Sequence, residues 1–268
     1  RQRQMCIRDS NMAAFRSAKP DVALFAEHDI NPAKSLQGHK FHDRQGASIE
    51  ETTSFITNNS HESARHRSFQ WGGTGWTAHP RIKDAIVDRG QDYTKLGRWS
   101  WARMKGRDEK YVRIVSAYRS NDSKGPNSVL QQQVRYFREK KHYVDPKPID
   151  IFDRDLKREI TKWMEMGDQI ILGIDANDTV DCGQFSGQML EVGLREAVSS
   201  QHPLNSPPAT YNRNTNRSTI DGLFVSFGVE VTQAGMLAYD SEKAWRSDHR
   251  LLWIKIETDS VIPGKRSS

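Results

Sequence analysis

The stretch from Gly167 to Val180, GDQIILGIDANDTV, joins a hydrophobic run directly to a polar one. Its first half, residues 170–174, has the aliphatic side chains typical of a buried β-strand. Its second half supplies a carboxylate, an amide and a carboxylate at Asp175, Asn177 and Asp178, with no turn signal in between. A buried charge is costly unless a partner compensates it. Either the strand leaves the core at Asp175, or a functional site begins there.

Polar residues also mark the ends of four other predicted strands. They are Glu27, Tyr118 with Asn121, Asp221, and Asp248 with His249. Each residue on its own is most simply a strand cap or part of a turn. Acids, amides and an imidazole that recur in order at strand ends instead predict a site at one edge of a sheet.

Hydrophobic periodicity predicts one mixed α/β domain. Amphipathic helices are expected over residues 127–141, 153–167 and 185–192, and a further helix over 11–19. A hairpin is expected over 97–122, and strands near 21–29, 72–79, 169–175, 220–226, 229–237 and 250–257. Residues 31–68 are interpreted as a loop with one short helix near 49–56, and residues 203–219 as a loop.

Length and composition fit a globular protein with a sizeable core. The chain has 268 residues, of which 28% are charged and 35% hydrophobic, so disorder is not expected. Its net charge of +6 suits a polyanionic partner without requiring one. Two cysteines, Cys6 and Cys182, form neither a disulfide framework nor a metal-binding spacing, which favours a reducing, intracellular location. No run approaches the about 18 apolar residues of a membrane span, and a monomer is expected.

The two ends of the chain are interpreted separately. Residues 1–10, RQRQMCIRDS, look like a translated cloning adaptor, so we exclude them from the fold. Residues 11–258 form the predicted domain. Residues 259–268 are expected to be a flexible tail.

Five motifs together resemble the endonuclease/exonuclease/phosphatase superfamily, which includes pancreatic-type deoxyribonuclease and the apurinic endonucleases. The motifs are PDVALFAEHD at 20–29, VSAYRSN at 115–121, GIDAND at 173–178, TIDGLFVS at 219–226 and SDHRLLW at 247–253. The resemblance implies a DNase I-like α/β sandwich of four layers, α/β/β/α. It also implies phosphate-ester hydrolysis with a divalent metal, normally Mg²⁺, with Mn²⁺ as a substitute.

The resemblance also implies a role for each matching residue. Glu27 and Asp248 would be carboxylates at the metal, which prefers hard oxygen ligands. Asp175 would orient and deprotonate the attacking water. Asn177 would donate its amide N–H to the phosphate without adding charge.

The remaining matching residues would hold the phosphate. His249 would hydrogen-bond a phosphate oxygen while Asp221 holds its imidazole. Tyr118 and Asn121 would complete the phosphate cradle. In one respect the chain departs from the family pattern: the family's first strand, which ends in an asparagine, has no counterpart before the helix expected at 11–19. We therefore expect an N-terminally truncated member that lacks this strand and is weakly active.

Three functions remain open from the sequence. The leading interpretation is a metal-dependent nuclease acting on DNA or RNA, supported by the site pattern and the basic charge. The second is an inositol-phosphate or lipid phosphoesterase; the segment YNRNTNRSTIDG at 211–222 lacks the Trp-Cys-Asp-Arg signature of inositol 5-phosphatases. The third is a catalytically silent binding domain. GIDAN and QQQVRYF are also similar to uncharacterised eukaryotic members and to endonuclease domains of mobile elements.

Two further features have simple structural interpretations. The basic cluster Arg135, Arg138, Lys140 and Lys141 is expected to be the solvated face of a helix, and would follow a nucleic-acid backbone only if it lay beside the site. Trp71, Trp76, Trp99 and Trp101 are expected to be mostly core, with base stacking as the alternative for one of them.

Overall fold

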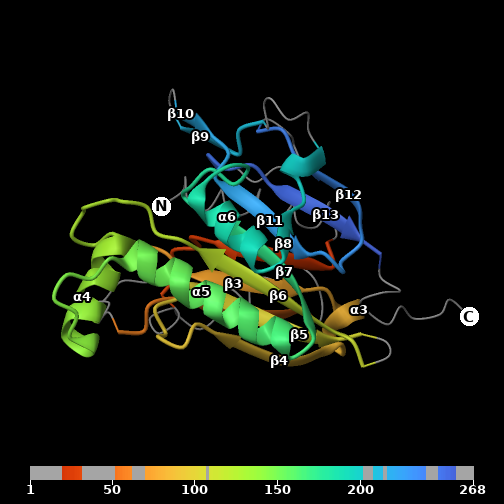
Figure 1. The fold of residues 1–268 in the computed structure, drawn as a ribbon, viewed down its shortest axis with the longest axis horizontal. Coiled ribbons are helices and arrows are strands. Elements are labelled where there is room, and N and C mark those ends of the chain that lie inside the picture. The colour runs from red at the N-terminus through yellow and green to blue at the C-terminus, as the bar shows by residue number, and fades with distance from the viewer. Residues whose placement is uncertain are drawn as a thin grey trace, which may run out of the picture.

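A six-stranded sheet forms the centre of the molecule (Figure 1). The computed structural model describes residues 20–31, 52–61, 70–106, 109–201, 208–213, 216–239 and 247–257. The order of the strands in the sheet is β4-β5-β6-β7-β11-β8. Their bounds are Ile86–Gln91 for β4, Trp99–Lys105 for β5, Tyr111–Tyr118 for β6, Asp168–Asp175 for β7, Leu194–Glu196 for β8 and Asp221–Ser226 for β11.

Helices cover one face of this sheet (Figure 1). They are α5 (Pro148–Glu165) and α6 (Gln184–Glu191), while α4 (Val129–Lys141) packs against α5 beside the strand ends. On β7, Ile170, Leu172 and Ile174 alternate toward this side and pack against α5 in one buried cluster. The three predicted helices at these positions and the predicted strand β7 are thus confirmed.

A second layer of strands covers the opposite face. It contains the three-stranded sheet β1-β3-β2 and the hairpin-like pair β12-β13. The bounds are Val22–Ala26 for β1, Thr53–Thr57 for β2, Thr74–Ala78 for β3, Val231–Met236 for β12 and Leu252–Ile256 for β13. A second buried cluster fills the space between the layers and includes Trp76, Met104, Ile114 and Ile171.

The described residues therefore show three layers: helices, the six-stranded sheet and the second strand layer. They contain no second layer of helices, since the only helix outside α4–α6 with more than three residues is the short α3 (Pro80–Lys83). Within the same residues, no helix is long and apolar enough to cross a membrane. The predicted helix at 11–19, the segment 1–10 and the tail at 259–268 lie outside the described part of the chain.

Several local predictions were wrong. The short helix expected near 49–56 is a strand, β2, whose β-branched residues pair with β3. The loop expected at 203–219 contains the hairpin of β9 (Tyr211–Arg213) and β10 (Asn216–Ser218). Strand β4 was not predicted, because its middle residues are polar and exposed, as is common at a sheet edge. The short β8 and the 3₁₀ turn Ser199–Gln201 also lacked a sequence signal.

The tryptophans follow the core interpretation with one exception. Trp76 and Trp99 are buried, and Trp101 packs partly buried against the helix-side core. Trp71 is half exposed. In the basic cluster, Arg138, Lys140 and Lys141 are exposed, as a solvated helix face predicts.

Candidate active site

Strand register brings three predicted site residues into adjacent positions. Tyr118 on β6 is the pairing partner of Asp175 on β7, and Asp221 on β11 pairs with Asp175 from the other side. Neighbouring strands lie about 4.8 Å apart, and paired residues point to the same face. Because Ile170, Leu172 and Ile174 face the helices, Asp175 faces the second strand layer.

Strand β1 delivers Glu27 to the same place. The Ser116 hydroxyl donates to the Phe25 carbonyl at 2.7 Å, which fixes the end of β1 above β6. Glu27 follows directly, and its Oε1 accepts a hydrogen bond from the Tyr118 hydroxyl. Two carboxylates, Glu27 and Asp175, are thus close enough to Tyr118 for their charges to raise its pKa.

His249 approaches from the segment before β13. Its Nδ1 lies 3.0 and 2.9 Å from the two carboxylate oxygens of Asp221. Thr210 Oγ1 fixes the backbone at this point by accepting from the Asp221 amide at 3.0 Å, and an isolated bridge pairs Tyr211 with His249. With Nδ1 engaged, Nε2 is the ring nitrogen that can face a substrate.

The carboxylates raise one another's proton affinity. Burial raises the pKa of Asp175 well above its usual range, and the charges of Asp221 and Glu27 add to this. Burial likewise raises the pKa of Glu27. Burial alone would lower the pKa of His249, but the hydrogen bond and charge of Asp221 outweigh it and raise that pKa to about 9. The site therefore holds more acidic groups than one imidazolium can neutralise.

This donor set fits a divalent cation. Ligand atoms of Asp175, Asp221 and His249 all lie within 4.8 Å of one another, so the three residues could hold a metal ion. Glu27 adjoins them, and its oxygens are the hard donors that Mg²⁺ or Mn²⁺ prefers. Asp248 is exposed, but its charge raises the pKa of Glu27, which places it near the same carboxylates.

Three residues of this edge have a left-handed backbone. The φ angles are 48° at Glu27, 57° at Asp29 and 45° at Asn177. Residues with a Cβ adopt this region at a cost of about 1–2 kcal/mol each, and such strain gathers at functional sites. At Asn177 the turn is held by the Asp175 carboxylate, which accepts the Asn177 amide at 3.2 Å, and by the Arg119 carbonyl, which accepts from Asn177 Nδ2 at 2.7 Å.

Not all predicted residues join this group. Six of them are connected by hydrogen bonds, by strand pairing or by the effect of their charges on one another's pKa: Glu27, Tyr118, Asp175, Asn177, Asp221 and His249. Asn121 is exposed, and its Oδ1 accepts from the Ser123 amide at 3.1 Å. In the part of the chain that the structure describes, it makes no hydrogen bond to the other six.

Sequence reasoning gave no role to Asp29 and Arg119. Asp29 Oδ1 accepts from the Gly72 amide at 2.9 Å, and burial together with the Glu27 charge raises its pKa to about 7. The Arg119 side chain binds buried Asp153 on α5 at 2.7 Å and the Ala176 carbonyl at 3.2 Å. Both residues lie within the five motifs, so their position beside Glu27 and Tyr118 was the available signal.

The chain is similar to known proteins in its fold but not detectably in its sequence. No protein-family model and no curated protein sequence matches the chain. Its structure is similar to the 3′ phosphatase NExo from Neisseria bound to a product DNA hairpin, with a TM-score of 0.62, 13% identity and coverage of 91% of this chain and 92% of that one.

Two further solved structures show the same fold. A mannosyl-6-phosphatase from Bacteroides thetaiotaomicron matches with a TM-score of 0.58 and 13% identity over 92% of this chain and 90% of its own. An endonuclease/exonuclease/phosphatase from Bacteroides vulgatus matches with a TM-score of 0.59 and 13% identity over 93% and 90%. The chain thus has the fold of endonuclease/exonuclease/phosphatase superfamily proteins over most of its length.

Proposed function

We propose that the protein is a metal-dependent phosphoesterase that hydrolyses phosphodiester bonds of DNA or RNA. The observation that carries this proposal is the convergence of Asp175, Asp221 and His249 with Glu27 and Tyr118 at one sheet edge. The positive net charge and the similarity to a fold seen bound to a DNA hairpin support a nucleic-acid substrate.

Asp175 is the proposed general base. Its raised pKa, caused first by burial, gives its carboxylate a greater affinity for a proton from the attacking water than an exposed aspartate has. Protonated His249, held through Nδ1 by Asp221, would donate from Nε2 to a phosphate oxygen. The charges of the two groups are thus complementary to a water and a phosphate placed between them.

Neutral donors would complete the phosphate site. Burial and the neighbouring Glu27 raise the pKa of Tyr118, so its hydroxyl stays protonated. Its single hydrogen is donated to Glu27 in this structure, and it would turn to the phosphate once Glu27 binds the metal. One amide hydrogen of Asn177 binds the Arg119 carbonyl, and the other can point to the phosphate. Asn121 is assigned to the same cradle, although its exposed side chain would first have to leave the Ser123 amide.

The metal would be held by Glu27, with Asp248 as the second carboxylate. When bound, Mg²⁺ would polarise the phosphate and neutralise charge on the leaving group. The mutual proximity of Asp175, Asp221 and His249 offers a second place for an ion, in competition with their roles as base and phosphate donors. The carboxylates at both places outnumber the neighbouring cations and raise one another's pKa. A divalent cation such as Mg²⁺ or Mn²⁺ would compensate this negative charge at either place.

A phosphomonoesterase is the second candidate function. The similarity to a mannosyl-6-phosphatase supports it, since that structure matches nearly as well as the DNA-bound one. An inositol phosphate or phospholipid headgroup would present the same phosphate chemistry to the site. A silent binding domain is disfavoured by the cost of bringing these carboxylates together.

The test is hydrolysis of a panel of substrates with Mg²⁺ or with EDTA. The panel contains single- and double-stranded DNA, RNA, an inositol polyphosphate and mannose 6-phosphate, each also incubated with the His249→Ala variant. Cleavage of a polynucleotide that needs both Mg²⁺ and His249 supports the proposal. Phosphate release from the monoesters alone moves the protein to the second candidate, and a folded but silent protein contradicts both.

A further inference from the structure

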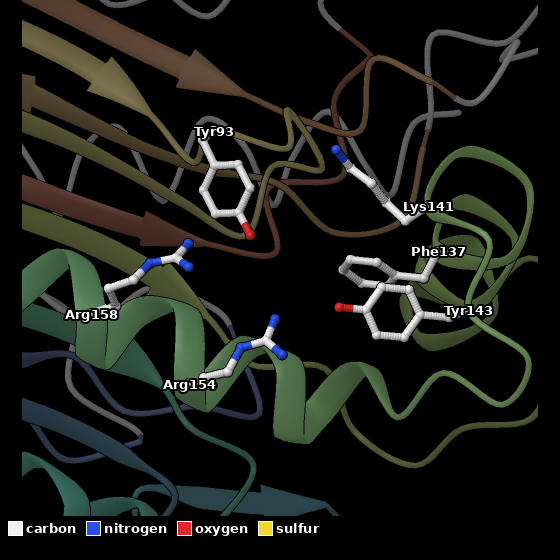
Figure 2. Close-up of a pocket in the computed structure, with 6 residues that line it drawn as sticks. All are labelled: Tyr93, Phe137, Lys141, Tyr143, Arg154 and Arg158. Carbon is white, nitrogen blue, oxygen red and sulfur yellow. The ribbon is translucent and has the colours of Figure 1, made fainter.

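A pocket with a volume of about 440 Å³ opens between α4, α5 and the turn after β4. Figure 2 shows its six lining side chains around one opening. They are Tyr93, Phe137, Lys141, Tyr143, Arg154 and Arg158. We call this group the basic aromatic pocket; it combines three aromatic rings with three cations and contains no carboxylate in its lining.

Two of the three aromatic rings, Phe137 and Tyr143, are held in place by the end of α4. His142 adopts a left-handed conformation with φ 56°, which turns the chain back so that the Tyr143 amide binds the Phe137 carbonyl at 3.1 Å. The Tyr143 ring then packs against Phe137 with 5.8 Å between ring centroids. Tyr143 is 40% exposed and Tyr93 51% exposed, so both can offer ring surface to a ligand.

A network with two buried carboxylates beneath the pocket binds some of its side chains. Fully buried Asp155 lies beneath the pocket and accepts hydrogen bonds from Tyr93 at 2.7 Å and from Arg154 at 2.9 Å. Arg98 binds Asp155 at 3.1 Å and the second buried acid, Asp92, at 3.3 Å.

Four cations therefore face two carboxylates in this network. The cations are Arg98, Lys141, Arg154 and Arg158, and the carboxylates are Asp92 and Asp155. Among the described residues, no carboxylate lies within ion-pair distance of Lys141, and the Arg158–Asp155 distance is a long 3.8 Å. The surplus of two positive charges is thus directed at the opening, where an anion would find donors.

The pocket and the candidate active site lie at the same edge of the six-stranded sheet. Strand β4 runs parallel to β6 and β7, because it is separated from β6 by one antiparallel strand, so Tyr93 follows its end at the edge that carries Tyr118 and Asp175. Three strand spacings from β4 to β7 correspond to roughly 14 Å. The Arg98 carbonyl accepts the Tyr118 amide at 2.9 Å, so a residue beneath the pocket is bonded directly to the site.

We infer that the basic aromatic pocket binds one nucleotide of the polynucleotide strand whose cleaved phosphate lies at Asp175; this rests on the proposed nuclease function. A nucleotide needs one aromatic surface for its base and cations for its phosphate, and base stacking on aromatic residues is tolerant of sequence. Arg154 and Arg158 supply planar donors that match phosphate oxygens, and Lys141 adds a mobile charge. The pocket volume is in the range of small-molecule sites. The strand would pass from the site toward α4 and α5, a few nucleotides away.

The test compares long and short substrates in steady-state kinetics. Lys141→Gln with Arg158→Gln, and separately Tyr143→Ala, should raise KM for a long oligonucleotide about tenfold while kcat stays unchanged. Both variants should cleave a dinucleotide, which cannot reach the pocket, like the unaltered protein. Lys157→Gln is the matched control, since it removes a cation from α5 that instead pairs with Glu191 at 2.6 Å. An unchanged KM for the long substrate in both pocket variants would overturn the inference.

Binding without turnover separates this inference from the proposed function. Labelled oligonucleotide and labelled mononucleotide are titrated in EDTA against protein with the intact or the altered pocket. We expect the intact protein to bind the oligonucleotide more tightly than the mononucleotide. In the Lys141→Gln/Arg158→Gln variant, the slope of log affinity against log salt concentration should be smaller by about 0.7 for each phosphate that the removed cations had neutralised. Equal affinity for both ligands, or affinity independent of the pocket residues, would overturn the strand assignment. A protein that shows the expected binding but cleaves no polynucleotide would contradict the nuclease function alone.

Discussion

The carboxylate of Asp221 lies 2.9 Å from Nδ1 of His249, and this contact holds the imidazole as a cation. Its effect on the pKa of His249, which rises to about 9, overcomes the opposite effect of burial. The same carboxylate raises the pKa of Asp175 on the neighbouring strand. One acid thus prepares both the proposed phosphate donor and the proposed base.

This contact predicts a pH-dependent stability of the metal-free protein. A histidine with a raised folded-state pKa contributes stability below its unfolded value, near 6.5, and loses this contribution as the pH rises through about 9. The full effect corresponds to about 3 kcal/mol of unfolding free energy. In Asp221→Asn we expect most of it to vanish, so that the difference between the two proteins is large below pH 6.5 and small above pH 9.

Urea unfolding in EDTA at both ends of this range measures the difference. His249→Gln provides the control, because it should remove the same pH dependence without changing the Asp221 charge. A difference between the parent protein and Asp221→Asn that is constant with pH would contradict the assignment.

Asp175→Asn should separate activity from stability. The amide cannot accept the water proton, so we expect kcat to fall by about 10²–10⁴. The same change removes a buried charge that Asp221 and Glu27 repel, so the metal-free variant should unfold at a higher temperature than the parent protein. Calorimetry in EDTA and a turnover assay in Mg²⁺ check the two halves. A variant with normal kcat would exclude Asp175 as the base.

Metal removal should lower the melting temperature of the unaltered protein. A ligand present at 100 times its dissociation constant stabilises the folded state by about 2.7 kcal/mol. If Glu27 and Asp248 hold the ion, Glu27→Gln should abolish this gain while His249→Gln largely keeps it. The opposite pattern would place the ion among Asp175, Asp221 and His249. Titration calorimetry with Mg²⁺ and Mn²⁺ on the two variants decides between these places.

The sequence predicted those helices and strands that have a clear hydrophobic pattern and end where the sequence becomes polar. Strand β7 and helix α5 have strong hydrophobic patterns, and both were found at the expected places. Strand β4 was missed because its exposed Asp88 and Arg89 hide the alternation, and β2 was taken for a helix although its partner β3 determines its conformation. Such pairing depends on residues distant in sequence, which a local pattern does not contain.

The candidate site, too, was predicted from the sequence only in part. Motif order was enough to predict that Asp175 and Asp221 meet, and the register places them as direct partners. The basic aromatic pocket had no sequence signal, because Tyr93 and Arg158 come from a turn and a helix that are distant in sequence and meet at buried Asp155. Lys141 was correctly placed on an exposed helix face, but that description did not reveal the pocket beside it.

The glycine in the middle of β7 should be needed for the two strand layers to approach each other. A Cβ on Gly173 would lie 2.7 Å from Leu24 Cδ1 on β1 and 3.3 Å from Leu223 Cδ2 on β11. Overpacking of this kind costs about 1–3 kcal/mol, so Gly173→Ala should lower the unfolding free energy by that amount. Because Glu27 directly follows β1, a displaced β1 should weaken Mg²⁺ binding as well. The double variant Gly173→Ala/Leu24→Ala creates room for the methyl group, and it should be more stable than the sum of the two single changes predicts; strict additivity in denaturant unfolding would contradict the contact.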